Sequence, residues 1–307
     1  MGYLFSLIGA LLFGANGSVT KVVIEGGLTA LQLTQFRALG TCVIAGLVLL
    51  IVDRSAFRLP PRQILIMAVL GVTGVAVLQA AYAGAIQLLP VGIALLFEYT
   101  AVLLVALVAF FFLKEKVKAQ LWVAIGCVLV GLAVVAEVWA GSLDGLGIVL
   151  ALVAAVSLTI YFLVGERQVG KTSPLAVAFW TTGFATIFWA FFSGWWELKP
   201  STFTHLVPVG GAIGSLDVPL WVPLAWSVVF GSFLSFLFSF LALKHLSATA
   251  AGIIASSEVI FAFLVAWLWL GEGLNPVQII GATVVLVGII LAQTARANKS
   301  IDADLAL

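Results

Sequence analysis

Long apolar segments separated by short polar breaks follow one another along almost the whole chain. Each has roughly 20 residues, the length of an α-helix that crosses the hydrocarbon core of a bilayer. The pattern predicts an all-α membrane protein with ten transmembrane helices. Their approximate ranges are Tyr3–Val23, Ala30–Val52, Gln63–Ala85, Val91–Leu113, Gln120–Ala140, Leu143–Val164, Pro174–Trp196, Val222–Leu243, Ala248–Leu270 and Pro276–Gln293.

Two of these segments resemble each other in the spacing of their polar residues. The distance from Pro90 to Glu115 equals that from Ser247 to Glu272, so the two segments align without a gap. We interpret this as a duplicated membrane unit. The predicted halves are residues 1–140 and 141–307, and the second half carries a long outer loop at 198–221 and a short cytoplasmic C-terminal tail.

Each half carries an acid inside its aligned segment. Glu98 aligns with Ala255, and Glu258 aligns with Ala101, so the two acids are displaced by three residues. Three residues make nearly one helical turn, so both carboxyl groups can lie on similar helix faces at different depths.

The distribution of basic residues predicts the orientation. With the N-terminus in the cytoplasm, eleven lysines and arginines lie on the cytoplasmic side, and Lys21, Arg37 and Lys199 lie on the outer side. This excess predicts that both termini are cytoplasmic. Because five spans per half is an odd number, the second half runs in the opposite direction. Such an inverted 5+5 repeat is typical of secondary transporters.

Composition excludes several other classes. The chain is 63% hydrophobic and 9% charged, with a mean hydropathy of +1.25, which is far from the balance of soluble domains. A net charge of +1 gives no reason to expect a nucleic-acid partner. Cys42 and Cys127 lie in apolar segments and are interpreted as packing thiols. The sequence has no H-E-x-x-H, G-x-S-x-G or Walker A motif and no Cys/His cluster, so we expect no enzymatic activity, metal or cofactor.

The two acids are the first candidates for function. A carboxylate inside the hydrocarbon region costs several kcal/mol unless it is paired, neutralised or wetted, so both should face the interior of the bundle. Glu98 either meets a substrate amine or carries a proton, or it is a protonated residue that fixes helix packing. Glu258, which follows Ser256 and Ser257, is interpreted as a coupling acid or a structural one.

Polar and aromatic residues at membrane depth complete the predicted site. A buried tyrosine offers an apolar face and a hydroxyl that needs a partner, which suits the wall of a solute cavity. Asn16 has the alternative role of an interhelical hydrogen bond, and Lys21 is expected to snorkel to the interface. We expect Arg37 to pack or to pair with an acid. The predicted substrate-binding residues are Glu98, Tyr99, Tyr82, Gln79, Asn16, Trp180 and Tyr161.

Several short motifs resemble one known superfamily. They are Phe36-Arg37-Ala38-Leu39, Phe112-Leu113-Lys114-Glu115, Ser256-Ser257-Glu258 and Trp269-Leu270-Gly271-Glu272. With the tandem five-helix units, they resemble the EamA-type branch of the drug/metabolite transporter superfamily, which includes the YddG-like amino-acid exporters. The resemblance covers essentially the whole chain and implies ten helices around a central cavity and export of small metabolites. Family units often carry Glu-Pro at the acid, whereas this chain has Glu98-Tyr99 and Glu258-Val259, which leaves a kink at these positions open.

These observations predict a secondary transporter of the inner membrane that exports small metabolites by alternating access. Amino acids are the leading substrate class, with aromatic or other apolar ones plausible. In this hypothesis Glu98 meets an ammonium group, and Tyr82 and Tyr99 contact the substrate side chain. The alternatives are export of cationic drugs or nucleotide-type metabolites, and a non-transporting scaffold or accessory subunit. The expected partners are a small-molecule substrate and the lipid bilayer, and a monomer is compatible with the sequence.

Overall fold

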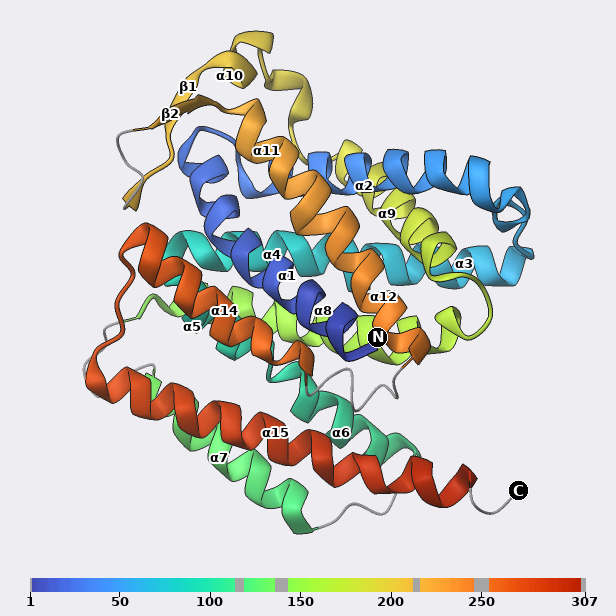
Figure 1. Ribbon diagram of the computed structural model, residues 1–307, viewed down its shortest axis with the longest axis vertical. Coiled ribbons are helices and arrows are strands. Elements are labelled where there is room, and N and C mark those ends of the chain that lie inside the picture. The colour runs from blue at the N-terminus through green and yellow to red at the C-terminus, as the bar shows by residue number, and fades with distance from the viewer. Residues whose placement is uncertain (1, 114–118, 136–142, 212–215, 246–253, 305–307) are drawn as a thin grey trace.

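The computed structural model describes residues 2–113, 119–135, 143–211, 216–245 and 254–304, which form a bundle of helices (Figure 1). The Lys114–Lys116 turn and the predicted boundary between the halves lie outside the described residues. The first half contains α1 (Gly2–Glu25), α2 (Ala30–Val52), η1 (Arg54–Phe57), α3 (Pro61–Val69), η2 (Leu70–Ala76), α4 (Val77–Leu88), α5 (Val91–Glu98), α6 (Ala101–Leu113) and α7 (Ala119–Val135). The second half contains α8 (Gly145–Val169), α9 (Pro174–Ala190), η3 (Trp195–Glu197), α10 (Pro200–Thr204), β1 (Leu206–Pro208), β2 (Asp217–Pro219), α11 (Trp221–Val228), η5 (Val229–Leu234), α12 (Ser235–His245), α14 (Ser257–Val265), η6 (Ala266–Leu270) and α15 (Pro276–Asp304).

The helices have the length and composition of an all-α membrane protein. Within the described residues, five helical stretches are long and apolar enough to cross a membrane: Gly2–Glu25, Ala30–Val52, Pro61–Leu88, Gly145–Val169 and Trp221–Ser239. Shorter apolar helices are Val91–Val105, Ala119–Val135, Pro174–Ala190, Ser257–Leu270 and Pro276–Leu291. Each predicted span overlaps one of these stretches, while the number of membrane crossings stays a prediction.

Local sequence signals start several of these helices. Thr29 caps α2 through a capping box with Gln32, which satisfies backbone N–H groups that have no partner in the first turn. The Ser173 hydroxyl accepts a hydrogen bond from the N–H of Ala176 and caps α9. Both α9 and α15 begin at a proline, whose fixed φ suits the first turn of a helix.

Among the described residues, η2, η5 and η6 are π-helical segments. Two of them lie at nearly equivalent positions of the two halves, in α3–η2–α4 and in α11–η5–α12. A wider turn shifts the backbone hydrogen bonds, so side chains of other helices can reach its carbonyl groups. Trp189 donates to the carbonyl of Ala76 in η2 at 3.1 Å, and Arg37 donates to that of Gly231 in η5 at 3.1 Å. The π-helical segments therefore tie each long helix to its neighbours.

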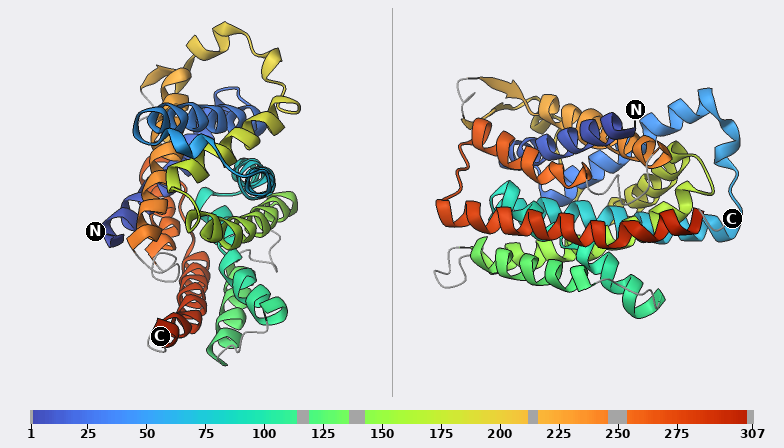
Figure 2. Two further views of the ribbon diagram at one scale, coloured as in Figure 1. Left: turned by 90° about the vertical axis from the view of Figure 1, so that its right-hand side faces the viewer. Right: turned by 60° about the horizontal axis from the view of Figure 1, so that its bottom comes forward.

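Helix pairing follows the same pattern in both halves. Helix α2 packs on α9, α7 on α15 and α5 on α14, so corresponding helices of the two halves meet each other. Helix α4 packs on α8, the first helix of the second half, and α12 packs on α1, the first helix of the first half. Figures 1 and 2 show α7 and α15 side by side at one edge of the molecule. The pairing is therefore unchanged when the two halves are exchanged.

The described part of the predicted outer loop adds a small β-hairpin to the helical fold. Strands β1 and β2 pair antiparallel, with Val207 opposite Val218. Val207 is buried against Leu28 and Leu220, and Trp269 donates to the carbonyl of Val209 at 3.0 Å. The hairpin therefore covers the end of the bundle where α1 and η6 finish, which we call the hairpin end (Figure 1).

Close packing of α7 against α15 yields the first prediction. A Cβ at Gly131 would lie 2.9 Å from the carbonyl oxygen of Gly281, and a Cβ at Gly281 would lie equally close to that of Gly131. Because these neighbours are backbone atoms, Gly131→Ala should lower the free energy of unfolding by about 1–3 kcal/mol. Thermal or denaturant unfolding in detergent measures the change.

Gly126 on the same helix is the matched control, because a Cβ there would meet no atom of the described residues within 4 Å. Gly126→Ala should leave stability unchanged or raise it slightly, since alanine favours the helix. Equal effects of the two substitutions would show that the α7–α15 contact is looser than described.

Candidate functional site

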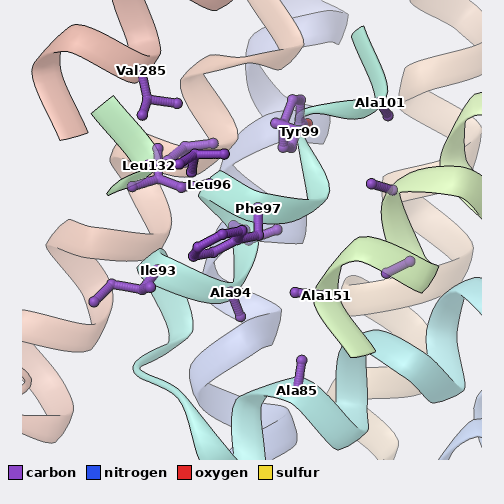
Figure 3. Close-up of a cluster of buried hydrophobic side chains, with 14 of the residues drawn as sticks. Ala85, Ile93, Ala94, Leu96, Phe97, Tyr99, Ala101, Leu132, Ala151 and Val285 are labelled. Atoms are coloured by element: carbon purple, nitrogen blue, oxygen red, sulfur yellow. The ribbon is translucent and has the colours of Figure 1, made fainter. Parts of the chain in front are cut away.

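The predicted span from Val91 is interrupted in its middle. Helix α5 ends at Glu98 and α6 begins at Ala101. The Thr100 hydroxyl donates to the carbonyl of Phe97 at 2.7 Å, a local bond that competes with helix continuation and bends the chain. Figure 3 shows Tyr99 at this turn, between Phe97 and Ala101, inside a cluster of apolar side chains. The helix therefore breaks at the acid although no proline is present.

The second half breaks at the aligned position. The chain makes a turn at Ser256, and α14 begins at Ser257. The Ser257 hydroxyl donates to the carbonyl of Ile254 at 2.6 Å. In the alignment of the two halves Ser257 matches Thr100 and Ile254 matches Phe97, so both breaks use the same hydroxyl-to-carbonyl bond. The open question about the missing proline is thereby answered: a hydroxyl-bearing residue accompanies each break.

Buried polar atoms without a protein partner gather beside the first break. Glu98 Oε2, the Tyr82 hydroxyl and both polar atoms of the Gln79 side chain are buried, and no described atom hydrogen-bonds to them. Gln79 and Tyr82 lie one turn apart on the same face of α4. Leaving such groups unpaired costs about 1–3 kcal/mol each, so they are expected to bind water or solute. We call Gln79, Tyr82 and Glu98 the polar cluster.

Arg37 supplies a positive charge to this cluster. It lies in α2, is 4% exposed, and interacts electrostatically with Tyr82 and Glu98. Its Nε donates to the Ser232 hydroxyl at 2.7 Å and its Nη2 to the carbonyl of Gly231 at 3.1 Å. These bonds to η5 hold the guanidinium in place while Nη1 has no hydrogen-bond partner among the described residues. Arg37 thus packs against the second half rather than forming an ion pair with an acid.

Tyr99 and Glu258 connect the two helix breaks. The Tyr99 hydroxyl lies 2.7 Å from Glu258 Oε2 and 3.0 Å from the carbonyl oxygen of Ala255. Glu258 also interacts electrostatically with Glu98, so the two predicted acids are near one another. Tyr99 therefore contacts the second half, and its hydroxyl is not free to meet a solute in this conformation.

The remaining predicted site residues lie in other contacts. Asn16 accepts a hydrogen bond from Ser227 at 2.7 Å and donates to Thr20 at 3.3 Å, so its amide joins α1 to α11. Trp180 donates to the carbonyl of Ala56 at 3.0 Å, near the turn after α2. The Tyr161 ring contacts Phe162 edge to face and Phe236 at a tilt. The structure therefore groups Gln79, Tyr82 and Glu98 with the helix breaks, and places Asn16, Trp180 and Tyr161 in contacts between helices.

The hairpin end is closed by a charged contact. Lys21 near the end of α1 forms an ion pair with Glu272, which follows η6. The other carboxylate oxygen of Glu272 accepts the backbone N–H of Val91 at 2.9 Å, at the start of α5. Lys21 therefore has a partner instead of snorkelling to the interface. One carboxylate joins the ends of three segments.

Several polar residues near the site were not predicted as binding residues. Arg37 was expected to pack or to pair with an acid, but not to supply the charge of the site. The hydroxyls of Ser18 and Thr41 and Oε1 of Gln35 are also buried, and no atom of the described residues hydrogen-bonds to them. Thr41 lies one turn after Arg37 on α2, so the pair gives α2 a polar face. The spacing of Arg37 and Thr41 by one helical turn was the signal in the sequence that could have identified this polar face.

Comparisons with known proteins bear on the family and on the fold of the chain. The model of the EamA-like transporter family matches residues 1–136 and 145–294. A protein of Archaeoglobus fulgidus, described as an uncharacterized transporter, is 28% identical over 236 residues, which are 76% of this chain and 77% of that protein. A protein of known crystal structure has a similar fold, with a TM-score of 0.65 and 18% identity over 97% of this chain and 98% of that chain.

The contact at the hairpin end gives the second prediction. Lys21→Met and Glu272→Gln each remove the ion pair, while a glutamine at 272 can still accept the N–H of Val91. The double variant should therefore be less destabilised than the sum of the single variants, with a coupling energy of about 1 kcal/mol or less. Denaturant unfolding of the four proteins at low salt measures this energy, and strictly additive effects would contradict the pair.

Proposed function

This chain belongs to the EamA-like transporter family, and on that premise we propose that it is a secondary transporter that exports amino acids across the inner membrane by alternating access. The observation that carries the proposal is the polar cluster, in which an unpartnered buried carboxylate stands beside a helix break. Discontinuous helices near the membrane midplane form the substrate sites of many secondary transporters, because their ends expose backbone and side-chain polar groups.

The symmetric helix pairing supports ten crossings and an inverted repeat. Helix α1 ends, η6 ends and α5 begins at the hairpin end, joined by Lys21, Glu272 and Val91. At the opposite end the start of α1 meets the end of α12, where Phe5 contacts His245. These are the neighbours that ten successive crossings require, whichever side of the membrane holds the N-terminus. If the two halves then swapped conformations, an inward-open arrangement would become an outward-open one.

The charges of the site favour a zwitterionic solute. Glu98 offers an acceptor for an ammonium group, and Arg37 offers donors for a carboxylate. The two groups interact electrostatically but form no ion pair with each other, so a small solute bearing both charges can satisfy both. Tyr82 adds an aromatic face, which suits aromatic or other apolar side chains.

Uptake of labelled amino acids into proteoliposomes tests the proposal. Purified protein should exchange external labelled amino acid for the same unlabelled compound inside, and excess unlabelled substrate should compete. If the protein exchanged cationic drugs or nucleotides but no amino acids, the substrate class would be one of those compounds instead. Absence of exchange with every solute would favour a scaffold or accessory role.

Substitution of the cluster carboxylate gives the third prediction. Glu98→Gln keeps the size of the side chain but removes the charge that meets the ammonium group. Exchange should fall about tenfold or more, which corresponds to roughly 1.4 kcal/mol of lost interaction. The unfolding temperature should stay nearly unchanged, because no described atom bonds to Glu98 Oε2.

Glu197→Gln is the control, since Glu197 lies exposed at the end of η3, directly before the predicted outer loop. It should exchange substrate like the original protein. If Glu98→Gln lost stability and activity together, Glu98 would be a structural residue instead.

The hydroxyl groups at the breaks give the fourth prediction. Thr100→Val and Ser257→Ala remove the bonds to Phe97 and Ile254, each worth about 0.5–1.5 kcal/mol net. We expect exchange to slow about two- to tenfold, because the break that shapes the site loses one of its bonds. Rates of exchange at saturating substrate measure the effect.

Thr283→Val is a matched control. Thr283 is exposed on α15 and makes the same type of bond, to the carbonyl of Ile279 at 2.8 Å. Its substitution should leave exchange unchanged. Equal slowing by Thr283→Val would remove any special role for the two breaks.

A further inference from the structure

The Tyr99 hydroxyl sits between two oxygen atoms that compete for its single hydrogen. Ala255 O lies 3.0 Å away and Glu258 Oε2 lies 2.7 Å away. A carbonyl oxygen can only accept, and a phenol has one hydrogen to donate. Both contacts are therefore satisfied when the phenol donates to Ala255 and the carboxyl group of Glu258 carries a hydrogen that it donates to Tyr99.

An ionised Glu258 would change this arrangement. A carboxylate is a stronger acceptor than a carbonyl, so the phenol hydrogen would turn to Glu258. The oxygens of Tyr99 and Ala255 would then face each other 3.0 Å apart with no hydrogen between them. Their repulsion and the unpaired carbonyl make that geometry unfavourable in an apolar surrounding.

We propose that Glu258 and Tyr99 form a proton-binding site that couples transport to a proton, an inference that rests on the proposed transport function. In the described conformation the proton resides on Glu258. Its loss to water on the side to which the site opens leaves a carboxylate, which takes the Tyr99 hydrogen bond away from Ala255. The carbonyl that is released lies directly before the turn at Ser256, so proton binding acts on the helix break of the second half.

The ionisable groups around Glu258 disfavour the state in which Glu98 and Glu258 are both ionised. Tyr99 faces Glu258 from the α5–α6 break, and Glu98 and Tyr82 lie within electrostatic range on α5 and α4. Arg37 on α2 acts on Glu98 and Tyr82. Helix α1 approaches Glu258 through Gly14, which brings no ionisable side chain. Repulsion between the carboxyl groups of Glu98 and Glu258 opposes ionisation of both at once. The positive charge of Arg37 acts on Glu98, so Glu98 is the acid whose ionised form it favours.

The assignment differs from that of a permanent structural acid. A purely structural acid would keep its proton throughout the transport cycle and would leave the accumulation of substrate independent of the pH gradient. A proton site exchanges its proton with water on both sides in turn. The two roles therefore predict the same hydrogen bonds in this conformation but different energetics of transport.

Infrared spectroscopy of the full-length protein near neutral pH tests the protonation state without any substrate. We expect a C=O stretching band of a neutral carboxyl group that is lost in Glu258→Gln and shifted in Tyr99→Phe, with Glu197→Gln as an unchanged control. A spectrum in which Glu258→Gln removes only carboxylate intensity would overturn the proposal. Because this measurement needs no transport, it separates the protonation of Glu258 from the proposed function.

Accumulation in proteoliposomes with an imposed pH gradient tests the coupling. The original protein should concentrate an amino acid above its external level at steady state, and Glu258→Gln should only equilibrate it. The steady-state ratio does not depend on the rate of transport, so a slow variant still gives a clear answer. Accumulation by Glu258→Gln, or exchange without accumulation by the original protein, would overturn coupling at this site. Absence of exchange altogether would instead reject the proposed substrate class.

Discussion

Backbone carbonyl groups that lose their helical partner inside a membrane need another donor, because hydrocarbon offers none. Much of the site described above follows from this constraint. Thr100 and Ser257 donate to carbonyls beside the two helix breaks, where the Phe97 carbonyl also accepts the backbone N–H of Thr100, and Arg37 and Trp189 donate to carbonyls of η5 and η2. The side chains that stabilise the irregular backbone thus come from neighbouring turns and helices. Helix packing and the shape of the site are therefore coupled.

The sequence predicts a duplicated unit, and the spacing of its polar residues agrees with the positions of the helix breaks in the structure. The offset that relates Glu115 to Glu272 also relates the two helix breaks, where Thr100 corresponds to Ser257. A repeated spacing of polar residues survives in the sequence because it preserves the length of each membrane helix. The π-helical segments were not predictable, because they depend on donors such as Trp189 that come from distant helices.

The candidate site was only partly predictable for a similar reason. Sequence gives the depth of a residue along its helix, and depth suffices to select Glu98, Tyr82 and Gln79. It does not give the rotation of each helix about its axis or the identity of the facing helix. Asn16 and Trp180 have suitable depth and chemistry, yet their polar atoms bond to Ser227 and to the backbone of Ala56.

The displacement of the two acids by three residues breaks the symmetry between the halves. Glu258 reaches the Tyr99 hydroxyl of the other break, whereas Glu98 keeps an oxygen without a partner. A strict repeat would have given both acids equivalent surroundings, and neither could then differ in its task. The displaced arrangement leaves Glu98 Oε2 without a partner among the described residues and places the Glu258 carboxyl group against Tyr99. The chain thereby has two acid positions with distinct surroundings around one pair of helix breaks.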